Sequence, residues 1–134
     1  MAIRPPRRRV VIVDDNRGFR LAAEAFVRAL PGVEVAGVAD SGARGLEVVE
    51  REAPDAVIVD IAMPDISGLE VASQLRRRPA RPGIILVSLH LDGATRSEGY
   101  RSGADAVVAK ADLVDELPQV LEAVFLDRAD RGQP

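Results

Sequence analysis

The sequence has no cysteine and a single histidine, His90. The absence of cysteine excludes disulfide frameworks, thiolate metal sites and thiol nucleophiles. One histidine is too few for a zinc site of the usual composition. There is also little excess charge of either sign, because the formal net charge is -3 at pH 7. The charge balance therefore gives no support for direct nucleic-acid binding by this chain.

The N-terminus lacks a long apolar run. Residues 4–9 are all arginine or proline, and only Val10 to Val13 follow before Asp14 interrupts. That run is far too short for a signal-peptide core or a membrane span. We therefore expect a cytoplasmic protein without a membrane segment. Residues 1–9 are interpreted as a flexible, basic lead-in to the first strand.

Five short runs rich in β-branched residues recur along the chain and alternate with amphipathic segments. Continuous apolar runs of this length are typical of strands that are buried on both faces, as in parallel sheets. The expected strands are residues 10–13, 33–38, 56–59, 84–87 and 106–108. The 134 residues fit one domain.

The segments between the strands carry apolar residues at helical spacing. We expect the first helix to begin after Asp15 or Asn16 as its N-cap, and the second to begin after Ser41. The third helix is expected to end in the basic residues 76–78, which suit the negative end of a helix dipole.

The last two helices are less regular. The segment 94–102 predicts a weak helix, because Gly99 interrupts it and few apolar residues mark a face. In the last helix we expect the regular part to start at Pro118, since proline cannot sit deep in a helix. The polar residues 127–134 are interpreted as a tail or a truncated linker.

Repeated strand–helix units imply right-handed crossovers and a parallel sheet with helices on both faces. With five strands, the predicted fold is α/β and flavodoxin-like (CheY-like), with a doubly wound sheet of order 2-1-3-4-5. No linker divides the chain, so one domain is expected over residues 10–126.

Polar residues stand at the carboxyl ends of four of these strands, where open α/β sheets build their sites. They are Asp14 and Asp15, Asp60, Ser88, and Lys110. Three clustered carboxylates repel one another unless a cation intervenes. Mg²⁺ suits such a site, because it needs only one or two carboxylates together with phosphate oxygens and water. A carboxylate can then act as nucleophile toward a phosphoryl donor, with the lysine meeting the negative charge.

The segments 10–16, 57–70, 84–88 and 103–110 resemble the receiver domain of bacterial two-component response regulators. The resemblance implies that Asp60 is the phosphoacceptor and that Lys110 pairs with its phosphoryl group. It implies Ser88 as the switch hydroxyl. The implied Mg²⁺ ligands are Asp14, Asp15, Asp60 and the backbone carbonyl of Ala62. Gly68 matches the loop after the acceptor, where we expect it to permit a backbone conformation that other residues resist.

The resemblance also implies partners. A sensor histidine kinase would supply the phosphoryl group, and the chain would be a monomer or a phosphorylation-linked homodimer. It would be a signalling phosphoacceptor that catalyses only its own phosphorylation and dephosphorylation, not a turnover enzyme.

Two residues depart from the family pattern. Val107 stands where many receivers carry an aromatic residue, and Ala111 stands where proline is common. The ending Lys110-Ala111-Asp112, together with Ser88-Leu89-His90 after the fourth strand, is more similar to the NarL/FixJ subgroup. That subgroup implies a C-terminal DNA-binding domain in a longer protein, or otherwise a separate output partner. His90 is interpreted as an exposed loop residue, or as one that tunes attack by water at the site.

Three alternatives remain at this point. A pseudo-receiver would be a protein-interaction module of the same fold that works without phosphorylation. A haloacid-dehalogenase-type enzyme would need Asp-x-Asp with its nucleophile on the first strand, whereas Asp60 lies on the third. A dinucleotide-binding domain would need a Gly-x-Gly-x-x-Gly motif after the first strand, which is missing.

Overall fold

The computed structural model describes residues 6–132 and forms one five-stranded parallel sheet of order β2-β1-β3-β4-β5, which confirms the predicted fold. All four pairs of neighbouring strands are parallel. The strands are β1 (Arg8–Val13), β2 (Val33–Ala39), β3 (Ala56–Asp60), β4 (Gly83–Ser88) and β5 (Ala106–Ala109).

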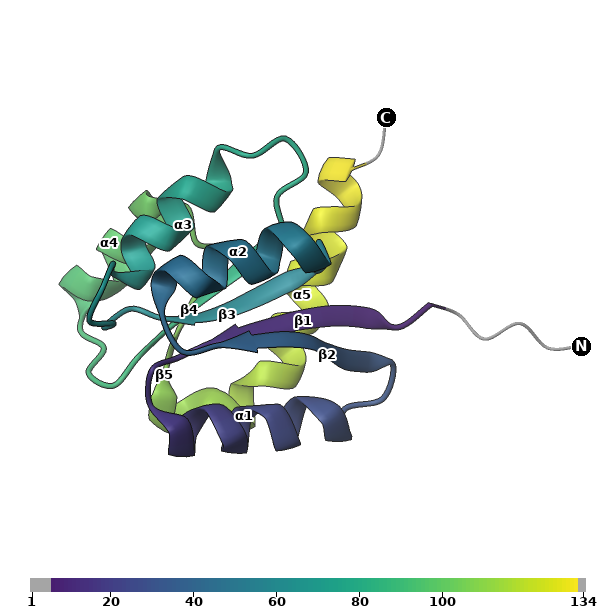
Figure 1. Cartoon of the computed structure of the whole chain (residues 1–134), viewed down its shortest axis with the longest axis horizontal. Coiled ribbons are helices and arrows are strands. Elements are labelled where there is room, and N and C mark those ends of the chain that lie inside the picture. The colour runs from purple at the N-terminus through teal and green to yellow at the C-terminus, as the bar shows by residue number, and fades with distance from the viewer. Residues whose placement is uncertain (1–5, 133–134) are drawn as a thin grey trace, which may run out of the picture.

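Helices cover both faces of this sheet (Figure 1). They are α1 (Arg17–Ala29), α2 (Gly42–Glu52), α3 (Gly68–Arg76), α4 (Gly93–Ser102) and α5 (Leu113–Gly132), with a short 3-10 turn, η1 (Lys110–Asp112), before α5. On one face α1 and α5 pack against Val10 and Ile12. On the other, α2 and α3 pack against Val11 and Val13. The alternation of side chains along a strand thus serves two separate cores.

Side-chain caps fix where four helices near the carboxyl ends of the strands begin, and α3 takes its cap from Ser67. Of the two predicted N-caps of α1, Asp15 and Asn16, the structure shows Asn16. Its Oδ1 accepts a hydrogen bond from the Phe19 amide at 2.9 Å. Ser41 caps α2, as predicted. Asp92 caps α4 and accepts from the Thr95 amide at 2.7 Å. Each cap satisfies an amide that has no partner inside its helix.

The prediction that the regular part of the last helix starts at Pro118 is wrong, because α5 begins at Leu113 and contains Pro118. Proline removes one backbone hydrogen bond there. Pro118 is exposed, so water can satisfy the carbonyl that loses its partner. Leu113, Leu117 and Leu121 are each buried on the sheet side, and this packing outweighs the lost bond.

The structure also extends the folded part at both ends. Arg8 and Arg9 belong to β1 rather than to a flexible lead-in, and the Arg9 amide donates to Asp55 Oδ2 at 2.8 Å. The predicted polar tail is helical as far as Gly132, and Arg128 of that segment pairs with Asp55 Oδ1 at 3.1 Å. Residues 1–5 and 133–134 of the two predicted segments lie outside the described residues. Across residues 6–132, no helix has both the length and the apolar character that spanning a membrane requires.

Candidate functional site

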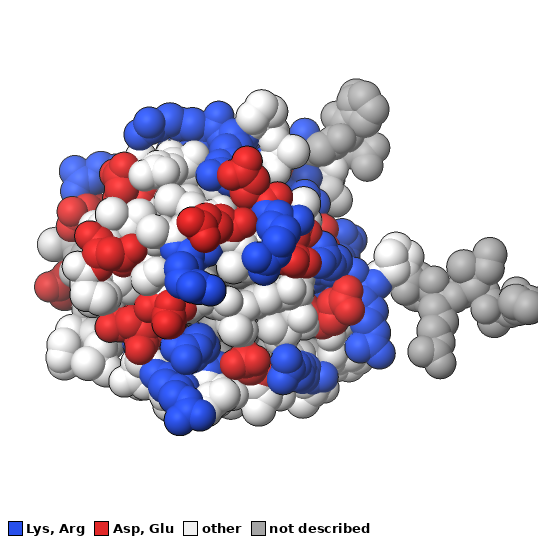
Figure 2. Space-filling model, in the orientation of Figure 1, with Lys and Arg blue, Asp and Glu red and all other residues white. Residues whose placement is uncertain are grey.

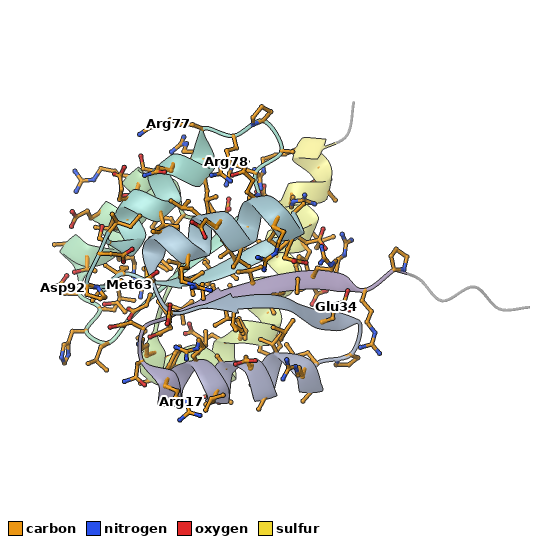
Figure 3. All side chains as sticks on the ribbon, in the orientation of Figure 1. Arg17, Glu34, Met63, Arg77, Arg78 and Asp92 are labelled. Atoms are coloured by element: carbon orange, nitrogen blue, oxygen red, sulfur yellow. The ribbon has the colours of Figure 1, made fainter. Side chains whose placement is uncertain are left out.

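The site lies at the carboxyl ends of the central strands, as predicted. Asp14 directly follows β1, Asp60 ends β3, and Ser88 ends β4. Met63 and Asp92, from the loops after β3 and β4, lie at this edge in Figure 3, and Glu34 lies toward the opposite end of the sheet. Polar groups from separate strands therefore meet at one edge of the molecule.

Three carboxylates form a compact cluster at this edge. One oxygen from each of Asp14, Asp15 and Asp60 lies within 4.8 Å of the others. Asp14 and Asp60 are 1% and 5% exposed, whereas Asp15 is exposed at the rim. The structure thus brings together the three acidic side chains that the sequence predicts as metal ligands.

Lys110 supplies the positive charge of the site. Its Nζ lies 2.8 Å from Asp14 Oδ2 and 3.2 Å from Asp60 Oδ2, and its side chain is only 12% exposed. Burial lowers the pKa of Lys110, but the hydrogen bond and charge of Asp14 and the charge of Asp60 outweigh it, so the pKa is raised overall. The ammonium therefore stays protonated between two carboxylates.

Asp60 is held by groups on both of its oxygens. Oδ1 accepts a hydrogen bond from the Ala62 amide at 3.2 Å, and Oδ2 accepts from Lys110. Burial, followed by the charge of Asp14, raises the pKa of Asp60, and Lys110 opposes that rise. A buried carboxylate whose pKa is raised by burial and by a neighbouring acid is a candidate functional group.

Asp14 provides a test of whether a divalent cation suits the cluster. Its Oδ1 accepts a hydrogen bond from the Asn16 amide at 2.8 Å. Its Oδ2 is buried without a well-aligned hydrogen bond, and meets only the ammonium of Lys110 among the described residues. The donor set contains only oxygen atoms, and Asp14 Oδ2 can accept a further partner, so the cluster fits Mg²⁺. The predicted contact of the Ala62 carbonyl stays a prediction.

The Ser88 hydroxyl points into its own loop. Its Oγ donates to the His90 carbonyl at 2.8 Å, and the residue is 9% exposed. His90 thus meets the site through its backbone, while the residue as a whole is exposed. Sequence reasoning considered only the imidazole and missed this contact, since any residue type supplies a carbonyl.

The prediction that Gly68 adopts a backbone conformation unfavourable to other residues is wrong. Its backbone is not left-handed, because the described glycines with positive φ are Gly32 and Gly103. Instead, a Cβ on Gly68 would lie 2.2 Å from the Asp60 carbonyl oxygen. Glycine is needed here for space, because α3 starts directly against the backbone of Asp60.

Asp65 supports the loop that follows Asp60, and sequence reasoning missed this role. Its Oδ1 accepts from the Gly42 amide at 3.0 Å and its Oδ2 from the Ala43 amide at 2.8 Å. These bonds lower the pKa of Asp65. They tie the loop after Asp60 to the first turn of α2. The contact between Asp65 and α2 could be found only in the structure, because the two lie far apart in the sequence.

The comparison with known families decides the identity. The model of the response regulator receiver domain matches residues 10–122. The chain belongs to the receiver domain family. This receiver is therefore homologous to the phosphoacceptor domains of two-component response regulators, and no observation favours the pseudo-receiver alternative.

Individual relatives agree with this assignment. The receiver is 29% identical to the signal receiver domain of a putative response regulator NarL from Mycobacterium tuberculosis, with a TM-score of 0.83 over 96% of this chain and 100% of that one. It is 28% identical to the transcriptional regulatory protein LiaR of Bacillus subtilis, over 94% of this chain and 57% of the relative. It is 31% identical to a protein-glutamate methylesterase/protein-glutamine glutaminase of Alkalilimnicola ehrlichii, over 94% of this chain and 34% of the relative. The receiver thus spans roughly a third to just over half of these two curated relatives.

Proposed function

We propose that Asp60 accepts a phosphoryl group from a sensor histidine kinase. The observation that carries this proposal is the buried Asp60 carboxylate, held between the Ala62 amide and Lys110 beside a second buried acid. An oxygen of Asp60 attacks phosphorus, the bond from phosphorus to the donor's imidazole nitrogen breaks, and that nitrogen regains its electron pair. The product is an acyl phosphate, which water later hydrolyses to phosphate and free Asp60.

We further propose Asp14, Asp15, Asp60 and the Ala62 carbonyl as the groups that hold Mg²⁺. When bound, this ion offsets negative charge on the transferring oxygens. Asp14 and Asp15 supply the carboxylates, and the hydrogen bond from the Asn16 amide orients Asp14. Lys110 keeps a positive charge next to Asp60, so the added phosphoryl charge meets a cation without reorganisation of the site.

Ser88 is proposed as the group that reports phosphorylation. Its hydroxyl now donates to the His90 carbonyl. A phosphoryl group on Asp60 offers stronger, charged acceptors. The exchange of one acceptor for the other would release the loop that leads into α4.

The test is the intact mass of the protein after incubation with acetyl phosphate and Mg²⁺. The wild type is expected to gain one phosphoryl group, and Asp60→Asn none. Asp115→Asn, which changes an exposed acid on α5, is the matched control and should still gain the group. A full gain by Asp60→Asn, or an equal rate in excess chelator, would contradict the proposal.

For the output, we propose a DNA-binding domain attached to the receiver or a separate partner, and a cytoplasmic location. The ending Lys110-Ala111-Asp112 and the segment Ser88-Leu89-His90 resemble the NarL/FixJ subgroup, and one similar structure is a NarL receiver. We propose that the receiver is a monomer or a phosphorylation-linked homodimer, and that it catalyses only reactions on its own Asp60. Light scattering with and without beryllofluoride measures the oligomeric state.

A further inference from the structure

Lys110 has a third neighbour besides its two carboxylates. Its Nζ lies 4.4 Å from the centroid of the Phe19 ring. This distance is within the range of about 6 Å over which an aromatic face attracts a cation. Phe19 lies in the first turn of α1, and Lys110 follows β5, so the contact joins two distant parts of the chain.

Lys110 needs a fixed support more than most side chains of the site do. Lysine is a point charge on a flexible four-carbon stem, which loses rotamer freedom when it is held. Both of its acidic partners come from across β4, because Asp14 follows β1 and Asp60 ends β3. Lys110 is also the only lysine in the sequence, so the described site has no second lysine that can replace it.

The Phe19 ring has a well-defined place. The Asn16 side chain caps α1 through the Phe19 amide, which fixes the first turn. The half-buried ring also packs against the core between the sheet and helices α1 and α5. Packing alone would accept leucine at this position. Leucine, however, has no aromatic face to attract the ammonium of Lys110.

We propose that Phe19 is a positioning residue for phosphotransfer, with its ring holding the Lys110 ammonium beside Asp60. This proposal rests on the function proposed above, and extends it to a residue outside the acidic cluster. A ligand that competes for the Asp14 and Asp60 oxygens would leave the ring contact intact. The ammonium then remains available to the new negative charge on Asp60.

The contact itself can be tested without metal or phosphate. Protein labelled with lysine that carries ¹³C at Cε gives a single lysine methylene signal, because the sequence has one lysine. A methylene above a ring face is expected at higher field than in exposed lysine. Phe19→Leu should move the signal toward the exposed position, and Phe19→Tyr should leave it near that of the wild type.

Phe26→Leu is the matched control. Phe26 lies on the same helix and packs against the same core, but its ring does not contact Lys110 among the described residues. The substitution removes the same aromatic group and should leave the lysine signal unchanged.

The role in function is tested by the affinity for beryllofluoride in Mg²⁺. Loss of one cation–π contact predicts binding about 2- to 30-fold weaker in Phe19→Leu, with Phe19→Tyr restored and Phe26→Leu unaffected. If Phe19→Leu does not fold, Phe19→Met fills the space without a ring and serves in its place.

Each outcome decides the proposal. An unchanged lysine signal in Phe19→Leu overturns the contact. Weaker binding by Phe26→Leu to the same extent, or no rescue by Phe19→Tyr, overturns the positioning role in favour of packing. Unaltered affinity in Phe19→Leu also overturns the positioning role. If the wild type itself does not bind beryllofluoride, the proposed phosphoacceptor function fails, while the lysine signal still tests Phe19.

Discussion

Burial and the neighbouring charge of Asp14 both disfavour the ionised form of Asp60, and Lys110 offsets only part of that cost. A group with these properties lowers the free energy of unfolding, and its place in the protein is explained by its chemistry. At the residue scale, the site is therefore a place where stability and function oppose each other. This opposition can be measured, because asparagine has the shape of aspartate without its charge.

Asp60→Asn is expected to stabilise the protein at pH 7 by about 0.5–2 kcal/mol. The folded-state pKa of Asp60 is raised from 3.8, so the native state holds the proton more tightly than the unfolded state does. The protonated Asp60 therefore contributes to the free energy of unfolding below pH 3.8. This contribution is lost as the pH rises through the folded-state pKa. Urea unfolding at several pH values should show the advantage of the variant shrinking as the pH falls.

Asp115→Asn changes an exposed acid and is expected to leave the urea midpoint nearly unchanged at each pH. An Asp60→Asn protein less stable than the wild type at pH 7 would show that the Lys110 pair outweighs the burial of Asp60.

Gly68→Ala is expected to destabilise the fold by about 1–3 kcal/mol, because its Cβ would lie 2.2 Å from the Asp60 carbonyl oxygen. Gly93→Ala is the matched control. Its Cβ would meet nothing within 4 Å, and it opens α4, so we expect a gain of about 0.4–1 kcal/mol. Urea midpoints of the two variants measure this, and equal midpoints would contradict the close approach.

At the scale of elements, α4 is the helix with the weakest anchoring. Gly99 is its only buried residue among those described. A Cβ there would lie 2.8 Å from Val107 Cγ2, and Arg96 donates to the Val107 carbonyl at 3.0 Å. Few apolar contacts place α4 at the low-stability end of the fold. The loop that carries Ser88 and His90 leads directly into it.

Phosphorylation is expected to change amide exchange mainly in residues 89–103, with little change on β5. Val107 has a stiff, short side chain and no large ring to swing, so the movement of Ser88 is transmitted through its loop to α4. Hydrogen exchange with and without beryllofluoride measures this. Asp60→Asn, which should show no response, is the control. Changes concentrated on β5, with residues 89–103 silent, would show a different route.

At the scale of the whole molecule, the two ends of the sheet have different tasks. The acidic cluster lies at the carboxyl ends of the strands. A hydrogen bond and two ion pairs link elements at the opposite end. Asp55 accepts from the Arg9 amide of β1 and pairs with Arg128 of α5, and Arg81 pairs with Asp105 at 3.1 Å. Elsewhere on the visible face, charges of both signs are interspersed (Figure 2). Exposed pairs of that kind contribute little individually.

A chain that ends at Leu126, the predicted domain limit, is expected to be less stable than the chain of 134 residues by about 1–2 kcal/mol. It loses the bonds of Arg128 to Asp55 and to the Arg81 carbonyl. Arg128→Ala in the longer chain should reproduce most of the loss. Urea unfolding measures both, and equal midpoints for the two lengths would support the domain limit at Leu126.

Much of this protein followed from its sequence alone. The apolar runs predicted five strands, and all five are present, because such short continuous runs are typical of strands in a parallel sheet. The edge strand β2 is only partly buried. The polar residues that end those runs then had to gather at one edge, because the strands are parallel. Asp14, Asp60, Ser88 and Lys110 were therefore placed correctly before any distance was known.

The tertiary structure alone decided the features that depend on contacts between distant segments. Pro118 remains helical because its neighbours pack on the sheet, and Arg8 and Arg128 are ordered because β1 and α5 extend past the apolar pattern. The contacts of Phe19 with Lys110 and of Ser88 with the His90 carbonyl have no sequence signal. Local preferences fix each element, but only packing sets the distance between two side chains that the chain itself holds far apart.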